Sequence, residues 1–151
     1  MTTFDVRRVL DPIISHGKAL GRLDVVTGHE PKSAPRGKLS AAVWVQSTDP
    51  VTSSGLNSSI RIVVQARIYA SMTSEPQDAI DPDMTNAAIE WVARLNGDLD
   101  LGGAARTIDV RAIHGVGLGA QAGYIEQDGR LFRVYTLTIP VLVNDVWTES
   151  A

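Results

Sequence analysis

Near the start of the chain, apolar residues recur with the period of a helix. They fall at i, i+3, i+4, i+7 and i+8 from Val6 to Ile14, and basic residues occupy the opposite face. This spacing predicts an amphipathic helix over residues 4–19. Pro12 lies well inside it and removes one backbone hydrogen bond, so the helix either kinks there or restarts with Asp11 as its cap.

A second helical pattern begins at the Asp-Pro-Asp sequence of residues 81–83. Asp81 is the expected N-cap and Pro82 the expected first helical residue, and Gly97 is expected to end the helix in a left-handed conformation. The pattern predicts a helix over residues 81–95 that lies across a sheet. Its buried stripe is expected to be Met84, Ala88, Trp91, Val92 and Leu95.

The other apolar residues mostly alternate with polar ones, as in strands that bury one face. Asp128-Gly129 is typical of the tight turn of a hairpin. The succession predicts an α+β fold: a single domain over residues 1–151, in which a mostly antiparallel sheet of four or five strands packs with the two helices. The strand candidates are residues 22–27, 39–46, 60–69, 106–113 and the hairpin 123–143.

Three segments lack a regular pattern. Residues 47–59 form a polar, turn-rich run that predicts an extended arm, and residues 70–80 form a second irregular stretch. Loops of this length in a compact domain tend to be contact surfaces. Residues 144–151 form a tail beyond the last strand, and its Trp147 either folds back on the domain or docks on a neighbour.

Composition narrows the possible functions. The chain of 151 residues is 44% hydrophobic and has no cysteine, which excludes disulfides, thiolate nucleophiles and cysteine-based metal sites. The formal net charge is -3, and residues 46–100 are the acidic part, so sequence-specific binding of nucleic acid is not expected. The chain has neither a membrane-spanning apolar stretch nor a secretory start, so we expect it to be made in the cytoplasm.

No motif in the sequence predicts an enzyme or a cofactor site. Residues 115–120 fit the dinucleotide pattern G-x-G-x-x-A, but a strand-and-turn pattern follows where a helix is required, which favours a glycine-rich loop between strands. His16, His29 and His114 do not have the spacing of metal ligands. The acidic cluster at residues 75–83 lacks the spacing of a calcium loop. We therefore expect no catalytic residues, no metal and no cofactor.

Several segments, in order along nearly the whole chain, resemble the tail terminator proteins of long-tailed actinobacterial phages. None of these segments is a catalytic signature. They are ISHG (14–17), LGRLDVV (20–26), HEPKSAP (29–35), AVW (42–44), SGL (54–56), RIY (67–69), EPQDAIDP (75–82), GDLDLGG (97–103), AQAGY (120–124) and VNDVW (143–147).

The resemblance implies a structural virion protein at the head-proximal end of the tail. Such a protein is a small α/β subunit that forms a ring, generally a hexamer, on the completed tail tube, where it stops tube growth and presents a surface for head–tail joining. Its partners would be further copies of itself, the tail tube protein and a head–tail connector or neck protein. Two alternatives stay open: another tail or neck subunit, such as a tube or head-completion protein, and a small ligand-binding domain or enzyme.

If the chain forms such a ring, its irregular segments should lie at interfaces. An acidic or neutral lumen wall would let DNA slide, because it repels phosphates. We therefore consider Glu75, Asp78, Asp81 and Asp83 as lumen residues; the alternative is that they keep the outer surface soluble. The predicted interface residues are Trp44, Pro50, Ser54, Leu56, Met72, Glu75 and Trp147.

Overall fold

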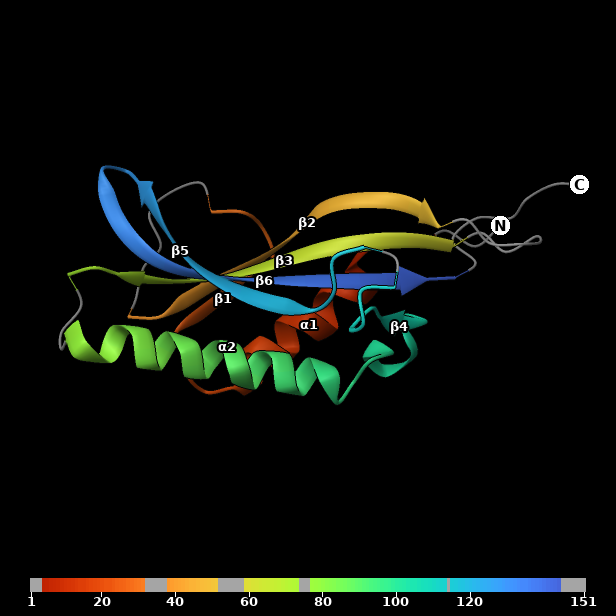
Figure 1. The fold of residues 1–151 in the computed structure, drawn as a ribbon, viewed down its shortest axis with the longest axis horizontal. Helices are drawn as coiled ribbons and strands as arrows, with labels where there is room; N and C mark the ends of the chain where they lie inside the picture. Colours follow the sequence, from red (N-terminus) through yellow and green to blue (C-terminus); the bar gives the residue numbers. More distant parts are fainter. Residues whose placement is uncertain (1–3, 32–37, 52–58, 74–76, 114, 145–151) are drawn as a thin grey trace, which may run out of the picture.

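A single curled sheet with both helices on one face forms the protein (Figure 1). The computed structural model describes residues 4–31, 38–51, 59–73, 77–113 and 115–144. The elements are α1 (Arg7–Ala19), β1 (Val25–Thr27), β2 (Ser40–Val51), β3 (Ser59–Ser71), the 3₁₀ turn η1 (Gln77–Ala79), α2 (Ile80–Asn96), the 3₁₀ turn η2 (Leu101–Gly103), β4 (Thr107–Ile108), β5 (Gly119–Gln127) and β6 (Arg130–Val143).

The strand order is β1-β2-β3-β6-β4, and β5 also pairs with β6. Every pairing is antiparallel except that of β1 with β2. The α+β class and the mostly antiparallel sheet are therefore confirmed. The sheet has six strands, of which β1 and β4 are only three and two residues long.

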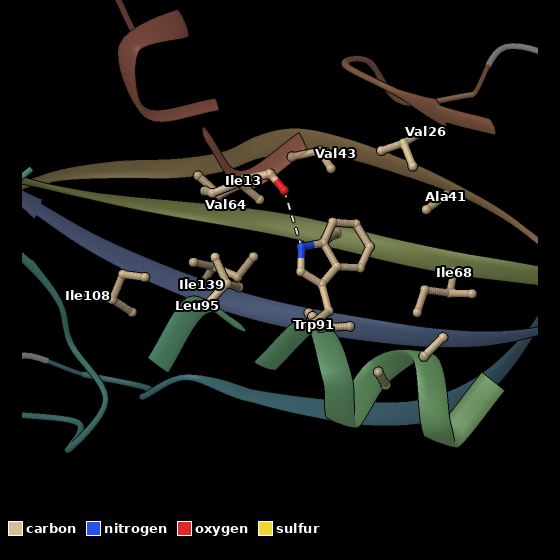
Figure 2. Close-up of a cluster of buried hydrophobic side chains, with 14 of the residues drawn as sticks. Ile13, Val26, Ala41, Val43, Val64, Ile68, Trp91, Leu95, Ile108 and Ile139 are labelled. Carbon is tan, nitrogen blue, oxygen red and sulfur yellow. Dashed lines mark hydrogen bonds between the residues drawn. The ribbon is translucent and has the colours of Figure 1, made fainter. Parts of the chain in front are cut away.

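The main core lies between the sheet and the two helices. Alternate residues of β2, β3 and β6 point to this side, and α2 contributes its buried stripe. Trp91 is at the centre of the layer, and its indole Nε1 donates a hydrogen bond to the main-chain carbonyl of Ile13 on α1 (Figure 2). Met84, Ala88 and Leu95 of the predicted stripe are buried as expected, whereas Val92 is only partly buried.

Helix α1 contains Pro12 without restarting at that residue. The helix runs without interruption from Arg7 to Ala19, so Asp11 does not cap a new helix. It begins three residues later than expected, where Asp5 Oδ1 accepts a hydrogen bond from the backbone N–H of Arg7 at 3.0 Å. Proline is tolerated because it costs a single hydrogen bond in a helix whose apolar face is otherwise well packed.

Both expected ends of α2 were wrong in detail. The helix starts at Ile80 after a 3₁₀ turn, so Asp81 lies inside its first turn and its side chain does not cap the helix. Asp81 instead pairs with Arg133 of β6. Gly97 has φ -85° and ψ -3°, so the helix does not end in a left-handed residue.

Two strand predictions also need correction. Residues 47–51 belong to β2 and pair with β3 across a register shift between Val45 and Ser47, so the hairpin extends into the segment expected to be an irregular arm. Of residues 106–113, only Thr107–Ile108 form a strand. Asp109 ends it, because its buried side chain accepts a hydrogen bond from the backbone N–H of Ile113 and closes a turn.

The opposite face of the sheet carries no helix in the described part of the chain. A smaller buried cluster, Ala42, Tyr69, Phe132 and Val134, lies at one end of this face. Tyr69 and Phe132 meet edge to face, with ring centroids 6.4 Å apart, and burial raises the pKa of the Tyr69 phenol. At the other end, Arg61 reaches the loop that connects β4 to β5.

Candidate interaction surfaces

Polar side chains that the sequence suggested as candidate ligands, such as His16, hold α1 and α2 together. His16 of α1 is hydrogen-bonded through Nε2 to Asp98 Oδ2 at 2.8 Å, and Arg94 Nε donates to His16 Nδ1 at 3.3 Å. The hydrogen bond to His16 lowers the pKa of Asp98. These contacts tie α1 to the C-terminal end of α2, which is a structural use of the histidine.

A second ion pair links the segment after α1 to α2. Arg22 donates from Nε and Nη2 to the two carboxylate oxygens of Glu90, at 2.7 and 3.0 Å. This pairing lowers the pKa of Glu90 and raises that of Arg22. The negative charge of Asp83, half-buried on α2, raises the pKa of Arg22 to a smaller extent.

Among the described residues, no group of three or more histidine and acidic side chains is arranged to hold a metal ion. Within the same part of the chain, no helix is long and apolar enough to span a membrane. Of the glycines in the G-x-G-x-x-A pattern, Gly115 and Gly117 lie between β4 and β5, and Gly119 is the first residue of β5. Because a strand follows, the interpretation as a loop between strands is confirmed, and the helix N-terminus that a pyrophosphate needs is missing there.

A cleft opens where the β5–β6 hairpin curls past the start of α2. It encloses about 400 Å³ and is lined by Met72, Asp78, Ile80, Asp81, Tyr124 and Arg133. Arg133 crosses it: Nε donates to Asp81 Oδ1 at 3.0 Å, Nη1 donates to the carbonyl of Gly123 at 3.3 Å, and the guanidinium stacks on the Tyr124 ring at 4.4 Å. The Tyr124 side chain is nevertheless 58% exposed.

The described residues of the 109–118 loop between β4 and β5, residues 109–113 and 115–118, form a second surface. It presents Ile113 and Val116, which are 72% and 68% exposed, together with the less exposed Val110. Arg111 is also exposed on this loop. Below it, Arg61 is only 8% exposed and donates from Nη2 to the carbonyl of Val116 at 2.6 Å. Three exposed aliphatic side chains on one short loop form a group of the kind that marks an interaction surface more than scattered single residues do.

The long β2–β3 hairpin provides a third surface. Trp44 is half-buried, and the Arg67 guanidinium lies over its ring at 5.5 Å, while Arg67 Nε donates to Thr136 Oγ1. Pro50 is exposed near the end of β2, where it pairs with Ile60. These side chains form a polar and aromatic face rather than an enclosed pocket.

The cleft brings a predicted interface residue, Met72, beside two residues that were predicted to line the lumen, Asp78 and Asp81. The predicted interface residues Trp44 and Pro50 lie apart from them, on the β2–β3 hairpin. Sequence analysis missed Tyr124, Arg133 and the 109–118 loop as surface features. The apolar run around Ile113 looked like a strand, and Tyr124 and Arg133 are separated by the turn that brings them face to face. Four predicted residues lie outside the described part of the chain: Ser54, Leu56, Glu75 and Trp147.

Known proteins resemble the chain in structure but not in sequence. No family model matches the chain, and no curated protein matches its sequence. The chain is similar in structure to the sheath/tube terminator of an extracellular contractile injection system, PVC, in its extended state, with a TM-score of 0.41 and 12% sequence identity. That alignment covers 100% of this chain and 62% of the injection-system protein, so this chain spans less than two thirds of its length.

Proposed function

We propose that this protein is a structural subunit that forms a ring, generally a hexamer, at the head-proximal end of a phage tail tube, where it ends tube growth and offers a surface for head–tail joining. The observation that carries the proposal is where the polar and the exposed apolar side chains of the described residues lie. His16 is hydrogen-bonded to Asp98 and joins structural elements, and four of the most exposed apolar side chains lie on the loop (Ile113 and Val116) and at or beside the cleft (Tyr124 and Leu131). A protein that works through its surfaces has this distribution.

The sequence resemblance to tail terminators supplies the particular role. In this proposal, the protein is not an enzyme and needs no cofactor; its partners are copies of itself, the tail tube protein and a connector or neck protein. The β2–β3 hairpin, including the segment over residues 47–59, and the segment over residues 70–80 contact those partners. Trp44, Pro50 and Met72 belong to these contacts, as do Ser54, Leu56, Glu75 and Trp147 outside the described part of the chain.

The acidic residues have two candidate roles in the ring. As a lumen wall, Asp78, Asp81 and Asp83, together with Glu75, would repel DNA. The pairing of Asp81 with Arg133 and the proximity of Asp83 to Arg22 reduce the local negative charge. Asp78 lines the cleft, and this place suits a contact with another protein better than a role in the lumen wall.

A second candidate function follows from the same geometry. The two apolar surfaces lie toward opposite ends of the sheet, and contacts between unlike surfaces give a ring when the rotation closes and an open filament when it does not. An open filament would favour a tube subunit over a terminator. The purified protein decides between them by native mass and negative-stain images. Closed rings of one size support the terminator, open tubes support the tube subunit, and a monomer at all concentrations contradicts both.

Particles made without the protein test the role directly. A terminator stops tube growth, so its loss should give tails of uncontrolled length that carry no head. A tube subunit is needed for the tail itself, so its loss should leave tails absent. Tails of normal, uniform length would contradict the terminator proposal and favour a head-completion role.

A further inference from the structure

Side-chain contacts and close backbone approaches hold the described residues of the loop, 109–113 and 115–118. Asp109 Oδ1 accepts the hydrogen bond from the Ile113 N–H at 3.0 Å, and Arg61 Nη2 donates to the Val116 carbonyl. Gly115 makes room for Arg61, because a Cβ there would lie 3.0 Å from Nη2. Gly117 lets the two sides of the loop approach, because its Cβ would lie 2.8 Å from the Val110 carbonyl oxygen. These contacts hold Ile113 and Val116 in exposed positions. Binding through them therefore loses less conformational entropy than binding through an unanchored loop would.

The cleft offers a surface of matching character. Met72 and Ile80 line it, and the exposed Tyr124 and Leu131 lie on the curled hairpin beside it. At about 400 Å³, it is large enough to receive side chains from another molecule. The exposed apolar groups that such a contact would cover are Ile113 and Val116 on the loop and Tyr124 and Leu131 at the hairpin.

The charges around the two surfaces are complementary. Arg111 is exposed on the loop, where Asp109 is buried. At the cleft, Arg133 is occupied by Asp81, which leaves the exposed Asp78 as the charge available to a partner. The exposed Arg111 beside Ile113 and Val116 thus corresponds to the exposed Asp78 at the cleft, and opposite charges of this kind align partners as well as attracting them.

One copy of the chain cannot bring these surfaces together. Along β6, Arg133 lines the cleft and Val141 pairs with Ile108 just before the loop, a separation of about 26 Å at ~3.3 Å per residue. Figure 1 shows the β5–β6 turn at the left end of the sheet and β4 toward the right. The partner of each surface must come from another molecule.

We infer that the 109–118 loop of one copy packs into the cleft of the next copy, with Ile113 and Val116 against Tyr124 and Met72 and with Arg111 facing Asp78. The contact joins unlike surfaces head to tail, so it propagates around a ring. This inference rests on the proposed function, for which it names the contact between subunits.

Two single variants and a matched control test the contact. Ile113→Asp introduces a charge on the loop, and Tyr124→Lys introduces one at the cleft that also repels Arg111. Both residues are mostly exposed, so each variant should fold, which the far-ultraviolet circular dichroism and the melting temperature will verify. Ile89→Asp is the control, because Ile89 is 61% exposed on α2 and belongs to neither surface.

We expect the wild type and Ile89→Asp to assemble at the same concentration, and each interface variant to need at least a tenfold higher concentration. Mixing Ile113→Asp with Tyr124→Lys should give dimers, because one intact loop and one intact cleft remain in each pair. Rescue of Arg111→Asp by Asp78→Arg in the same chain should restore assembly. Native mass measurements read out all of these results.

The outcomes separate this inference from the function on which it rests. If Ile113→Asp and Tyr124→Lys assemble like the wild type into closed rings, the inference is wrong and the ring proposal stands. If the wild type forms open filaments that both variants abolish, the contact is right and the terminator proposal fails. A wild type that stays monomeric at every concentration overturns both.

Discussion

The indole Nε1 of Trp91 donates a hydrogen bond to the main-chain carbonyl of Ile13 at 3.2 Å. That carbonyl belongs to the middle of α1, so the bond joins the two helices beneath the sheet (Figure 2). Trp91 is fully buried, and a buried indole N–H without a partner would cost about 1–3 kcal/mol. The contact requires α1 to approach closely, and Gly17 provides the space.

Gly17→Ala should destabilise the fold. An added Cβ would lie 2.6 Å from Cζ2 of Trp91, and this fully buried ring is also held by its hydrogen bond to Ile13. We expect a loss of about 1–3 kcal/mol in the free energy of unfolding, typical of an overpacked core. Urea denaturation will measure it. Gly97→Ala is the control: Gly97 is not left-handed and its Cβ would make ordinary contacts, so its stability should stay the same or rise slightly.

Replacing Asp98 by Asn should change how stability depends on pH. The hydrogen bond from His16 lowers the pKa of Asp98 below its usual 3.8 in the folded protein. A lowered folded-state pKa contributes stability that is present above pH 3.8 and is lost as the pH falls through the folded pKa. The wild type should therefore exceed Asp98→Asn in stability at pH 6, and the difference should shrink below pH 3.8.

Denaturation midpoints between pH 3 and 7 check this expectation. Asp11→Asn serves as the control, because it removes the same charge from an exposed position on α1 without removing the hydrogen bond between His16 and Asp98. A difference between wild type and Asp98→Asn that stays constant over the whole range would show that the carboxylate charge contributes nothing.

Gly129→Ala should weaken the β5–β6 hairpin. Asp128 and Gly129 both have positive φ, 53° and 72°, as a two-residue hairpin turn requires. An alanine held in that conformation costs about 1–2 kcal/mol. Thermal unfolding will detect the loss. Gly119→Ala in β5 is the matched change, since its Cβ meets nothing within 4 Å and its φ is not left-handed.

Gly115→Ala should loosen the 109–118 loop without unfolding the protein. The new Cβ would press on the Arg61 guanidinium at 3.0 Å, and φ at this position is +139°. Hydrogen exchange of the Ile113 amide, which is bonded to Asp109, should become faster, while exchange in the centre of β3 should not change. Equal exchange in variant and wild type would mean that Arg61 does not hold the loop.

Much of the architecture follows from local patterns in the chain. The period of apolar residues located both helices to within a few residues, and the Asp128-Gly129 turn was placed correctly because that pair suits positive φ better than most residues do. Alternation along residues 60–69 identified the central strand, which has core on one face. These features depend on near neighbours in sequence, so the sequence carries them directly.

The ends of elements and the surfaces depended on tertiary contacts. Asp81 satisfies the rules for a cap, but Arg133, 52 residues away, provides the partner that its carboxylate takes. Residues 47–51 are polar and turn-rich, but pairing with β3 holds them in a strand because an adjacent strand satisfies their backbone groups. The alternation of residues 106–113 predicts that Ile113 belongs to a strand. In the structure its backbone N–H instead donates a hydrogen bond to Asp109, which closes a turn.

The amino-acid sequence by itself determined the α+β class, the two helices, the hairpin turn and the lack of cysteine chemistry. Only the tertiary structure decided that Arg133 and Tyr124 share a cleft with Met72 and Asp78, and that Arg61 anchors an exposed aliphatic loop. The physical reason is the separation along the chain of the residues that interact. Helical period and turn preference act over a few residues, whereas a cleft or an anchored loop joins residues that the chain separates by dozens of positions and that only the curl of the sheet brings together.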